Sequence, residues 1–89
     1  MILFEGAGDS IADPVVVIGA KNSIEGVSSE YDYLQQRFGE KDKDWFFISQ
    51  KLLNENEKFY DKLTLELKDK SKIDIYFDIS AFFHKGLNI

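Results

Sequence analysis

The sequence predicts an α+β domain in which one amphipathic helix packs on an antiparallel three-stranded β-meander. Three observations support this fold: a helical stripe of apolar residues, strict apolar–polar alternation over two later segments, and short polar stretches between the elements. An N-terminal strand and a short C-terminal helix complete the expected order, β-α-β-β-β-α. The chain has 89 residues, so we expect a single domain covering 1–89.

The N-terminal strand is expected after a loop-like beginning. Residues 1–13 are rich in Gly, Asp and Ser, and we treat them as a candidate flexible arm. Pro14 then introduces the β-branched run at 15–18, which ends at Gly19. A short continuous apolar run of this kind is typical of a strand with both faces covered.

The clearest helix signal follows this strand. Apolar residues recur at spacings of three and four and share one helical face: Ile24, Val27, Tyr31, Leu34 and Phe38. Asn22 and Glu25 resemble a capping box, although Ser28 is a rival cap. We therefore expect a helix from Ser23 or Ser28 to Phe38, with Gly39 as the residue of positive φ that ends it.

Three strands of a meander are expected next. The first runs from Trp45 to Leu53, and the other two alternate with a period of two. Their apolar sides carry Leu63, Leu65 and Leu67 in the second strand and Ile73, Ile75, Phe77 and Ile79 in the third. Pairing Leu67 with Ile73 keeps all these residues on one face, although it places Glu66 opposite Asp74.

The last expected element is a short helix after the meander. Ser80 is a candidate cap for one turn through Ala81, Phe82, Phe83 and His84, which Gly86 would end. We expect the two phenylalanines to close one end of the core.

Charge and composition restrict the classes of partner. Residues 1–40 carry seven acidic and two basic side chains, whereas 41–89 carry nine of each, so the net charge of −5 comes from the N-terminal half. With one Arg in the chain and no basic stripe, we expect no nucleic-acid partner. The absence of Cys favours a reducing compartment, and the apolar opening is too short for a membrane span. These features predict a cytoplasmic protein without a membrane partner.

No motif indicates catalysis or a cofactor. His84 is the only histidine, so no His pair can bind zinc. Residues 17–23 resemble a strand, turn and helix start but lack the glycine spacing of a phosphate-binding loop. A carboxylate pair such as Asp74 and Asp78 is better explained as solvated surface charge. We expect no catalytic, cofactor-binding or metal-binding residues and no enzyme, unless a deep pocket joins His84 to a buried carboxylate.

Two surfaces are candidate partner-binding sites. If Phe46, Ile48 and Leu52 join the core, the second face of the meander carries aromatic and acidic residues: Trp45, Phe47, Tyr60, Tyr76, Asp74 and Asp78. The alternative is that the N-terminal arm or the strand at 14–18 covers this face. The helix is expected to expose an acidic ridge opposite its apolar stripe: Glu25, Ser29, Asp32 and Gln36, with Glu30 nearby. Simple solvation is the alternative there.

These observations predict a small acidic protein-binding module. One form is a bacterial antitoxin or immunity-type inhibitor that masks a basic surface of its partner. The alternative is a structural homo-oligomer, or the small subunit of a larger assembly, without catalytic activity.

Overall fold

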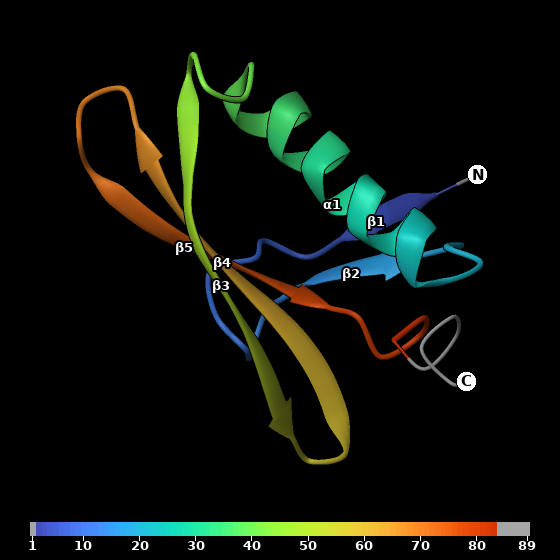
Figure 1. Cartoon of the computed structure of the whole chain (residues 1–89). Helices are drawn as coiled ribbons and strands as arrows, with labels where there is room; N and C mark the ends of the chain where they lie inside the picture. Colours follow the sequence, from blue (N-terminus) through green and yellow to red (C-terminus); the bar gives the residue numbers. More distant parts are fainter. Residues whose placement is uncertain (1, 84–89) are drawn as a thin grey trace.

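The chain forms one helix packed against a five-stranded mixed sheet (Figure 1). The computed structural model describes residues 2–83. Six elements follow one another: β1 (Leu3–Glu5), β2 (Val15–Ile18), α1 (Ser23–Phe38), β3 (Trp45–Glu55), β4 (Lys58–Leu67) and β5 (Lys72–Asp78). The α+β class is confirmed, and the radius of gyration of 12.7 Å is close to the ~12 Å expected of a compact domain of this length.

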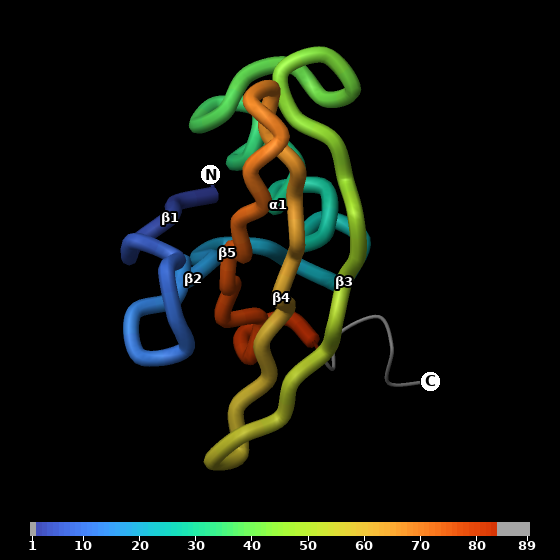
Figure 2. The backbone as a smooth tube through the Cα atoms, turned by 90° about the vertical axis from the view of Figure 1, so that its left-hand side faces the viewer, coloured from blue at the N-terminus to red at the C-terminus, as the bar shows by residue number. Residues whose placement is uncertain are grey.

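The strands are ordered β1-β2-β5-β4-β3, so β1 and β3 are the two edges of the sheet (Figure 2). β3, β4 and β5 form the predicted antiparallel meander. β2 confirms the predicted N-terminal strand and pairs in parallel with β5. β1 was not predicted, because it is a three-residue strand inside the expected arm, where it pairs antiparallel with β2.

The last two strands show the predicted side-chain directions but not the predicted pairing. The odd-numbered residues form the buried side: Leu63, Leu65, Ile75 and Phe77. Leu65 pairs with Ile73, whereas the sequence predicted Leu67 at that position. A shift of two residues keeps the same faces together, so the alternation does not distinguish the two pairings. The observed pairing places Glu66 opposite Lys72 rather than an aspartate, which replaces a repulsive pair with an attractive one.

Helix α1 begins and ends at its predicted capping residues. Asn22 Oδ1 accepts a hydrogen bond from the Glu25 N–H at 2.9 Å, and Glu25 Oε1 accepts one from the Lys21 N–H at 3.1 Å. The helix therefore begins at Ser23 and not at Ser28. Gly39 follows its end with φ of +108°, a conformation that other residues rarely adopt.

The predicted apolar stripe of α1 is confirmed at Tyr31, Leu34 and Phe38, which pack in or against the core, and was wrong at Ile24 and Val27. Ile24 is 85% exposed and Val27 is 40% exposed, and within the stripe only Leu34 is fully buried. A Cβ atom on Gly26 would lie 2.2 Å from the ring of Phe82, so the missing side chain lets this ring pack directly on the helix. This close approach turns the Gly26 side of the helix inward and leaves Ile24 and Val27 outside.

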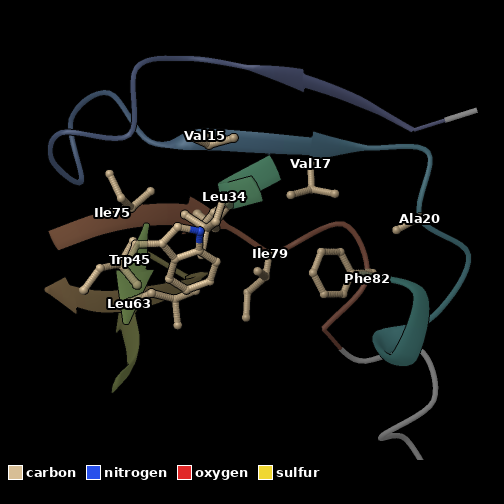
Figure 3. Close-up of a cluster of buried hydrophobic side chains, with 11 residues drawn as sticks. Val15, Val17, Ala20, Leu34, Trp45, Leu63, Ile75, Ile79 and Phe82 are labelled. Carbon is tan, nitrogen blue, oxygen red and sulfur yellow. The ribbon is translucent and has the colours of Figure 1, made fainter. Parts of the chain in front are cut away.

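The hydrophobic core lies between α1 and the sheet (Figure 3). It draws on both strands and helix, and its buried members are Val15, Val17, Ala20, Leu34, Trp45, Leu63, Leu65, Ile75, Phe77, Ile79 and Phe82. Trp45 is fully buried, and its Nε1–H donates to the carbonyl oxygen of Gly39 at 2.8 Å. This bond satisfies the indole donor inside the core.

The side-chain directions in β3 are the reverse of those expected before a bulge and agree with them after it, where Leu52 pairs with Asp61 on the helix side. Trp45 pairs with Leu67 on the helix side of the sheet, and Phe47 follows on the same side opposite Leu65. The pairing is interrupted by a bulge between Phe47 and Ser49, so Ile48 is an extra residue without a partner in β4. The expected core residues of this strand are instead exposed: Phe46, Ile48 and Leu52.

The predicted C-terminal helix does not form in residues 80–83, which are the part of it that the structure describes. Residues 80–83 form a turn in which the N–H groups of Phe82 and Phe83 both donate to Ile79. The Ser80 hydroxyl accepts from the Phe59 N–H at 3.0 Å instead of capping a helix. Phe82 is buried and Phe83 packs against the core, so the two rings close its end as predicted. His84 lies outside the described residues.

Candidate functional site

A cavity of about 210 Å³ lies between the N-terminal half of α1, strands β3 and β4, and the turn at 79–83. Its walls are mainly apolar, and the residues that line it are Ser23, Val27, Gln50, Leu52, Asp61, Ile79, Phe82 and Phe83. Pockets for drug-sized ligands measure about 300–1,000 Å³. This cavity therefore suits a group the size of one side chain.

The wall formed by the turn is tied to the rest of the molecule on two sides. The Ser23 hydroxyl lies 3.3 Å from the carbonyl oxygens of both Phe82 and Phe83, to which it can donate. The ring of Phe83 stacks on Phe59 of β4 with 4.5 Å between centroids. The turn is therefore held against both α1 and β4, which gives the cavity a defined shape.

Asp61 supplies a buried carboxylate to this cavity. Its position in β4 has the same parity as Leu63, so the strand directs it to the helix side of the sheet, where it is 3% exposed. Gln50 of β3 donates from Nε2 to Asp61 Oδ1 at 2.7 Å. The ion pairs within residues 2–83 do not include Asp61, so its charge has a neutral donor but no described cation.

Glu30 brings a second carboxyl group to Asp61 from α1. It is 1% exposed, and no donor group in the described part of the chain bonds either of its carboxyl oxygens. Burial first, and then the charge and hydrogen bonding of Asp61, raise the pKa of Glu30 from 4.5 to about 10. At neutral pH Glu30 is therefore protonated, and its O–H is the group that can donate to Asp61.

The pair thus combines one proton with two carboxyl groups in a dry environment. Such a pair carries about one negative charge at neutral pH, and burial makes an unpaired charge costly. Perturbed carboxyl groups beside a cavity are typical of functional sites, where they bind cations or transfer protons. Residues 2–83 contain no cluster of three or more His, Cys, Asp or Glu side chains that could hold a metal ion.

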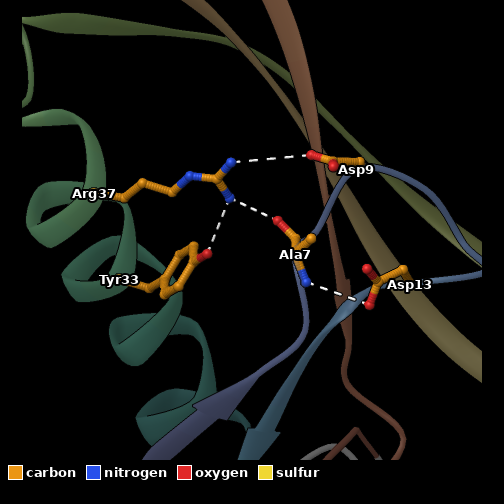
Figure 4. A network of polar contacts seen from close by, with 5 residues as sticks. All are labelled: Ala7, Asp9, Asp13, Tyr33 and Arg37. Carbon is orange, nitrogen blue, oxygen red and sulfur yellow. Dashed lines mark hydrogen bonds and ion pairs between the residues drawn. The ribbon is translucent and has the colours of Figure 1, made fainter.

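A second polar cluster surrounds Arg37 near the end of α1 (Figure 4). Its Nη1 donates to the carbonyl oxygen of Ala7 at 2.7 Å and to the Tyr33 hydroxyl at 3.0 Å, and Nη2 lies 4.0 Å from Asp9. Asp13 in turn accepts from the Ala7 N–H at 3.3 Å. These bonds attach the loop after β1 to the helix, so we assign Arg37 a structural role.

The predicted aromatic face is divided between the two sides of the sheet. Trp45 and Phe47 lie on the helix side, so their expected position was wrong. Tyr60 and Asp78 pair with each other on the opposite side, where both are largely buried. The other two predicted residues are more accessible there: Tyr76 and Asp74. Asp74 accepts from the Thr64 hydroxyl at 2.6 Å and lies 3.9 Å from Lys62.

The predicted acidic ridge of the helix is also divided. Glu30 and Ser29 are buried, which contradicts their expected exposure. Glu25 is used in the helix cap. Asp32 remains exposed, and it takes part in none of the ion pairs within residues 2–83. The ridge therefore reduces to isolated acidic residues.

Four of the large apolar side chains that are exposed lie on β3. We call the following residues the β3 edge surface: Phe46, Phe47, Ile48 and Leu52, each between 37% and 49% exposed. Phe47 also contacts Tyr31 of α1, with 6.4 Å between ring centroids. Leu52 lines the cavity together with Val27, so this surface continues to the cavity and the exposed side of the helix.

No protein-family model, curated protein or solved structure matches this chain. Among residues 2–83, no helix is long and apolar enough to cross a membrane. The functional inference therefore depends on the cavity, the carboxyl pair and the β3 edge surface.

The carboxyl pair was missed at the sequence level for an identifiable reason. Asp61 shares its parity with the buried leucines of β4, which was a signal for an inward carboxylate. Glu30 gave no such signal, because it lies outside the apolar stripe that was expected to face the core. Only the observed orientation of α1 brings the two groups together.

Proposed function

We propose that this chain is a small acidic protein-binding module and that the β3 edge surface is its binding surface. The observation that carries this proposal is the position of β3, an eleven-residue strand at the edge of the sheet that pairs with β4 along one side. The free side of an edge strand can add an extended segment of another protein through backbone hydrogen bonds. Exposed Phe46 and Ile48 supply apolar contacts for such a segment.

The partner that we propose is a separate protein with a basic surface. The chain carries a net charge of −5, and Asp32 is exposed on the helix without a described ion pair. Opposite charge accelerates association and selects among partners. An antitoxin or immunity-type inhibitor that masks a basic surface fits this combination of size, charge and apolar edge. Its activity would be binding rather than catalysis.

The second candidate is a structural homo-oligomer in which β3 pairs with β3 of another copy. The free edge favours this candidate, because the β3 strands of two copies can pair antiparallel about a two-fold axis. The like charge of the copies opposes it. Light scattering over a range of concentrations separates the candidates, since a strict monomer removes the homo-oligomer.

The binding surface can be tested with two matched substitutions. Ile48→Lys places a charge on the β3 edge surface, whereas Ile18→Lys makes the same change at an exposed position of β2 away from β3. A partner is first captured from the source cells with the native chain and then purified for affinity measurements. We expect Ile48→Lys to weaken binding by about tenfold or more, and Ile18→Lys to leave it unchanged.

Two results would overturn the proposal. Equal affinity of the native chain and Ile48→Lys would remove the β3 edge surface as the binding surface. An affinity that stays constant between about 0.05 and 0.3 M salt, and that survives Asp32→Lys, would remove the basic partner.

A further inference from the structure

We propose that the cavity beside Asp61 binds an organic cation, an alkylguanidinium or alkylammonium group, whose charge contacts Asp61, the member of the Glu30–Asp61 pair that lines the cavity. This site goes beyond the proposed function, because it can be occupied in the isolated chain. Its two parts match the two parts of such a ligand. The Asp61 carboxylate faces the charged head, and the apolar wall of Val27, Leu52 and Phe82 covers the alkyl stem.

The charge of Asp61 has no cationic partner among the described residues. Asp61 lines the cavity and is 3% exposed, and its described hydrogen-bond donor is the neutral amide of Gln50. No cation of residues 2–83 forms an ion pair with Asp61 or Glu30. A buried carboxylate is stabilised strongly by a cation that reaches it, because the surroundings screen the attraction poorly.

The carboxyl oxygens of Glu30 have unused capacity to accept hydrogen bonds. Both of its carboxyl oxygens are buried and receive no donor within the described chain, although they face Asp61. Such oxygens are normally bonded. Glu30 itself is not part of the cavity lining, so the ligand meets Asp61. A guanidinium group carries five N–H donors in a planar fork and can bond both oxygens of one carboxylate at once, whereas an ammonium is a compact point charge. The site should therefore prefer the guanidinium head.

The size and polarity of the cavity match those of a short alkyl cation. About 210 Å³ with mainly apolar walls accommodates a short alkyl chain and one charged head. A hydrated metal ion finds one carboxylate here, that of Asp61, and mainly apolar surface otherwise, which is a poor oxygen ligand set for Mg²⁺ or Ca²⁺. The same cation chemistry can come from a free amine or from the Arg or Lys side chain of a bound protein.

Binding of a cation is expected to release a proton from the pair. Burial and then the charge of Asp61 on β4 raise the pKa of Glu30, and burial and then the charge of Glu30 raise the pKa of Tyr31 beside it on α1. A cation favours the ionised form of Glu30, so the ligand displaces its proton. Affinity should therefore rise as the pH rises from 6 to 9.

The probe is n-butylguanidinium, and n-butylurea is its neutral control of nearly the same shape. We expect NMR titration of the full chain to shift the signals of Val27 and Leu52 with butylguanidinium, and calorimetry in two buffers of different ionisation enthalpy to detect proton release. Asp61→Asn should weaken binding of this cation by about tenfold or more. Glu30→Gln should retain weaker binding but abolish the proton release. Asp74→Asn, on the other side of the sheet, is the control and should change neither quantity.

Three results would overturn the site: equal affinity for butylurea and butylguanidinium, unchanged binding by Asp61→Asn, or no shift at Val27 and Leu52. If a short peptide with a central Arg binds more tightly than butylguanidinium, the natural cation is a side chain of a protein. If the peptide binds more weakly, it is a free amine or guanidine.

Discussion

Glu30 of α1 and Asp61 of β4 face each other in the interior, with 1% and 3% of their surfaces exposed. The two residues are 31 positions apart in the chain (61 − 30). The pair can exist in the folded chain because Glu30 retains its proton, which removes one of two like charges. The pair therefore makes stability depend on pH in a direction that can be measured.

Glu30→Gln is expected to stabilise the chain at neutral pH. Burial and Asp61 raise the pKa of Glu30 from 4.5 to about 10, so above pH 4.5 the folded chain holds a proton that the unfolded chain releases. This difference lowers the free energy of unfolding by about 1.4 kcal/mol per pH unit. By pH 7 the loss is roughly 3 kcal/mol, and glutamine, which has no proton to lose, should recover most of it.

Urea unfolding at pH 5, 7 and 9 measures this effect. The advantage of Glu30→Gln over the native chain should be small at pH 5 and grow as the pH rises. Asp32→Asn, on the exposed side of the same helix, is the control and should show no such trend. A difference that is the same at all three pH values would contradict a raised pKa of Glu30.

The regular strands were the part of the fold that the sequence could predict well. Alternation with a period of two gave the buried side of β4 and β5 correctly. It could not give the pairing of Leu65 with Ile73, because a shift of two residues conserves the pattern and the polar turn at 68–71 tolerates either. Nor could it locate the bulge at Ile48, which reverses the sides in β3.

The candidate site could not be predicted, because it depends on contacts between distant residues. The apolar stripe through Ile24 and Val27 indicated the wrong side of α1, since the helix packs through a glycine and a protonated glutamate. Judged by hydrophobicity alone, glycine and glutamate are both expected at the surface. The fit between Gly26 and the Phe82 ring is a matter of shape, which the spacing of residues does not encode.

Gly26→Ala tests this fit. Alanine favours helix by about 1 kcal/mol over glycine, but its Cβ would lie 2.2 Å from the Phe82 ring. The ring is buried in the core, so the crowding should cost about 1–3 kcal/mol and exceed the gain. Chemical denaturation should show a net loss of stability. Ser28→Ala, at an exposed helical position, should be neutral or stabilising.

The double variant Gly26→Ala with Phe82→Leu separates crowding from other effects. If the ring is the obstacle, the double variant should lose less stability than the sum of the two single changes. Additive losses would show that Gly26 acts in another way.

Trp45 provides a direct optical test of the reversed sides of β3. It is the only tryptophan of the chain and is fully buried, so its fluorescence should resist quenching by acrylamide until the chain unfolds. Trp45→Phe removes the donor to the Gly39 carbonyl and part of the core volume, which should cost about 1–3 kcal/mol. Ready quenching in the native state would place Trp45 at the surface, as the sequence had indicated.

Arg37→Met should release the loop after β1 while keeping the apolar part of the side chain. The guanidinium group bonds the Ala7 carbonyl and the Tyr33 hydroxyl, and these bonds join the loop to α1 (Figure 4). Their loss should destabilise the chain by about 1–2 kcal/mol. Hydrogen exchange should accelerate at the Gly8 N–H, which donates to Asp13 within the loop, and at the Tyr76 N–H, which donates to Gly8.

The amide of Leu65 in β4 is the internal reference for this measurement. The Gly8 and Tyr76 amides depend on the position of the loop, whereas Leu65 is buried within the paired strands β3, β4 and β5. Faster exchange confined to the two loop-dependent amides supports a local anchor. Equal acceleration at Leu65 would instead show that Arg37 stabilises the whole fold, because global unfolding exposes every amide alike.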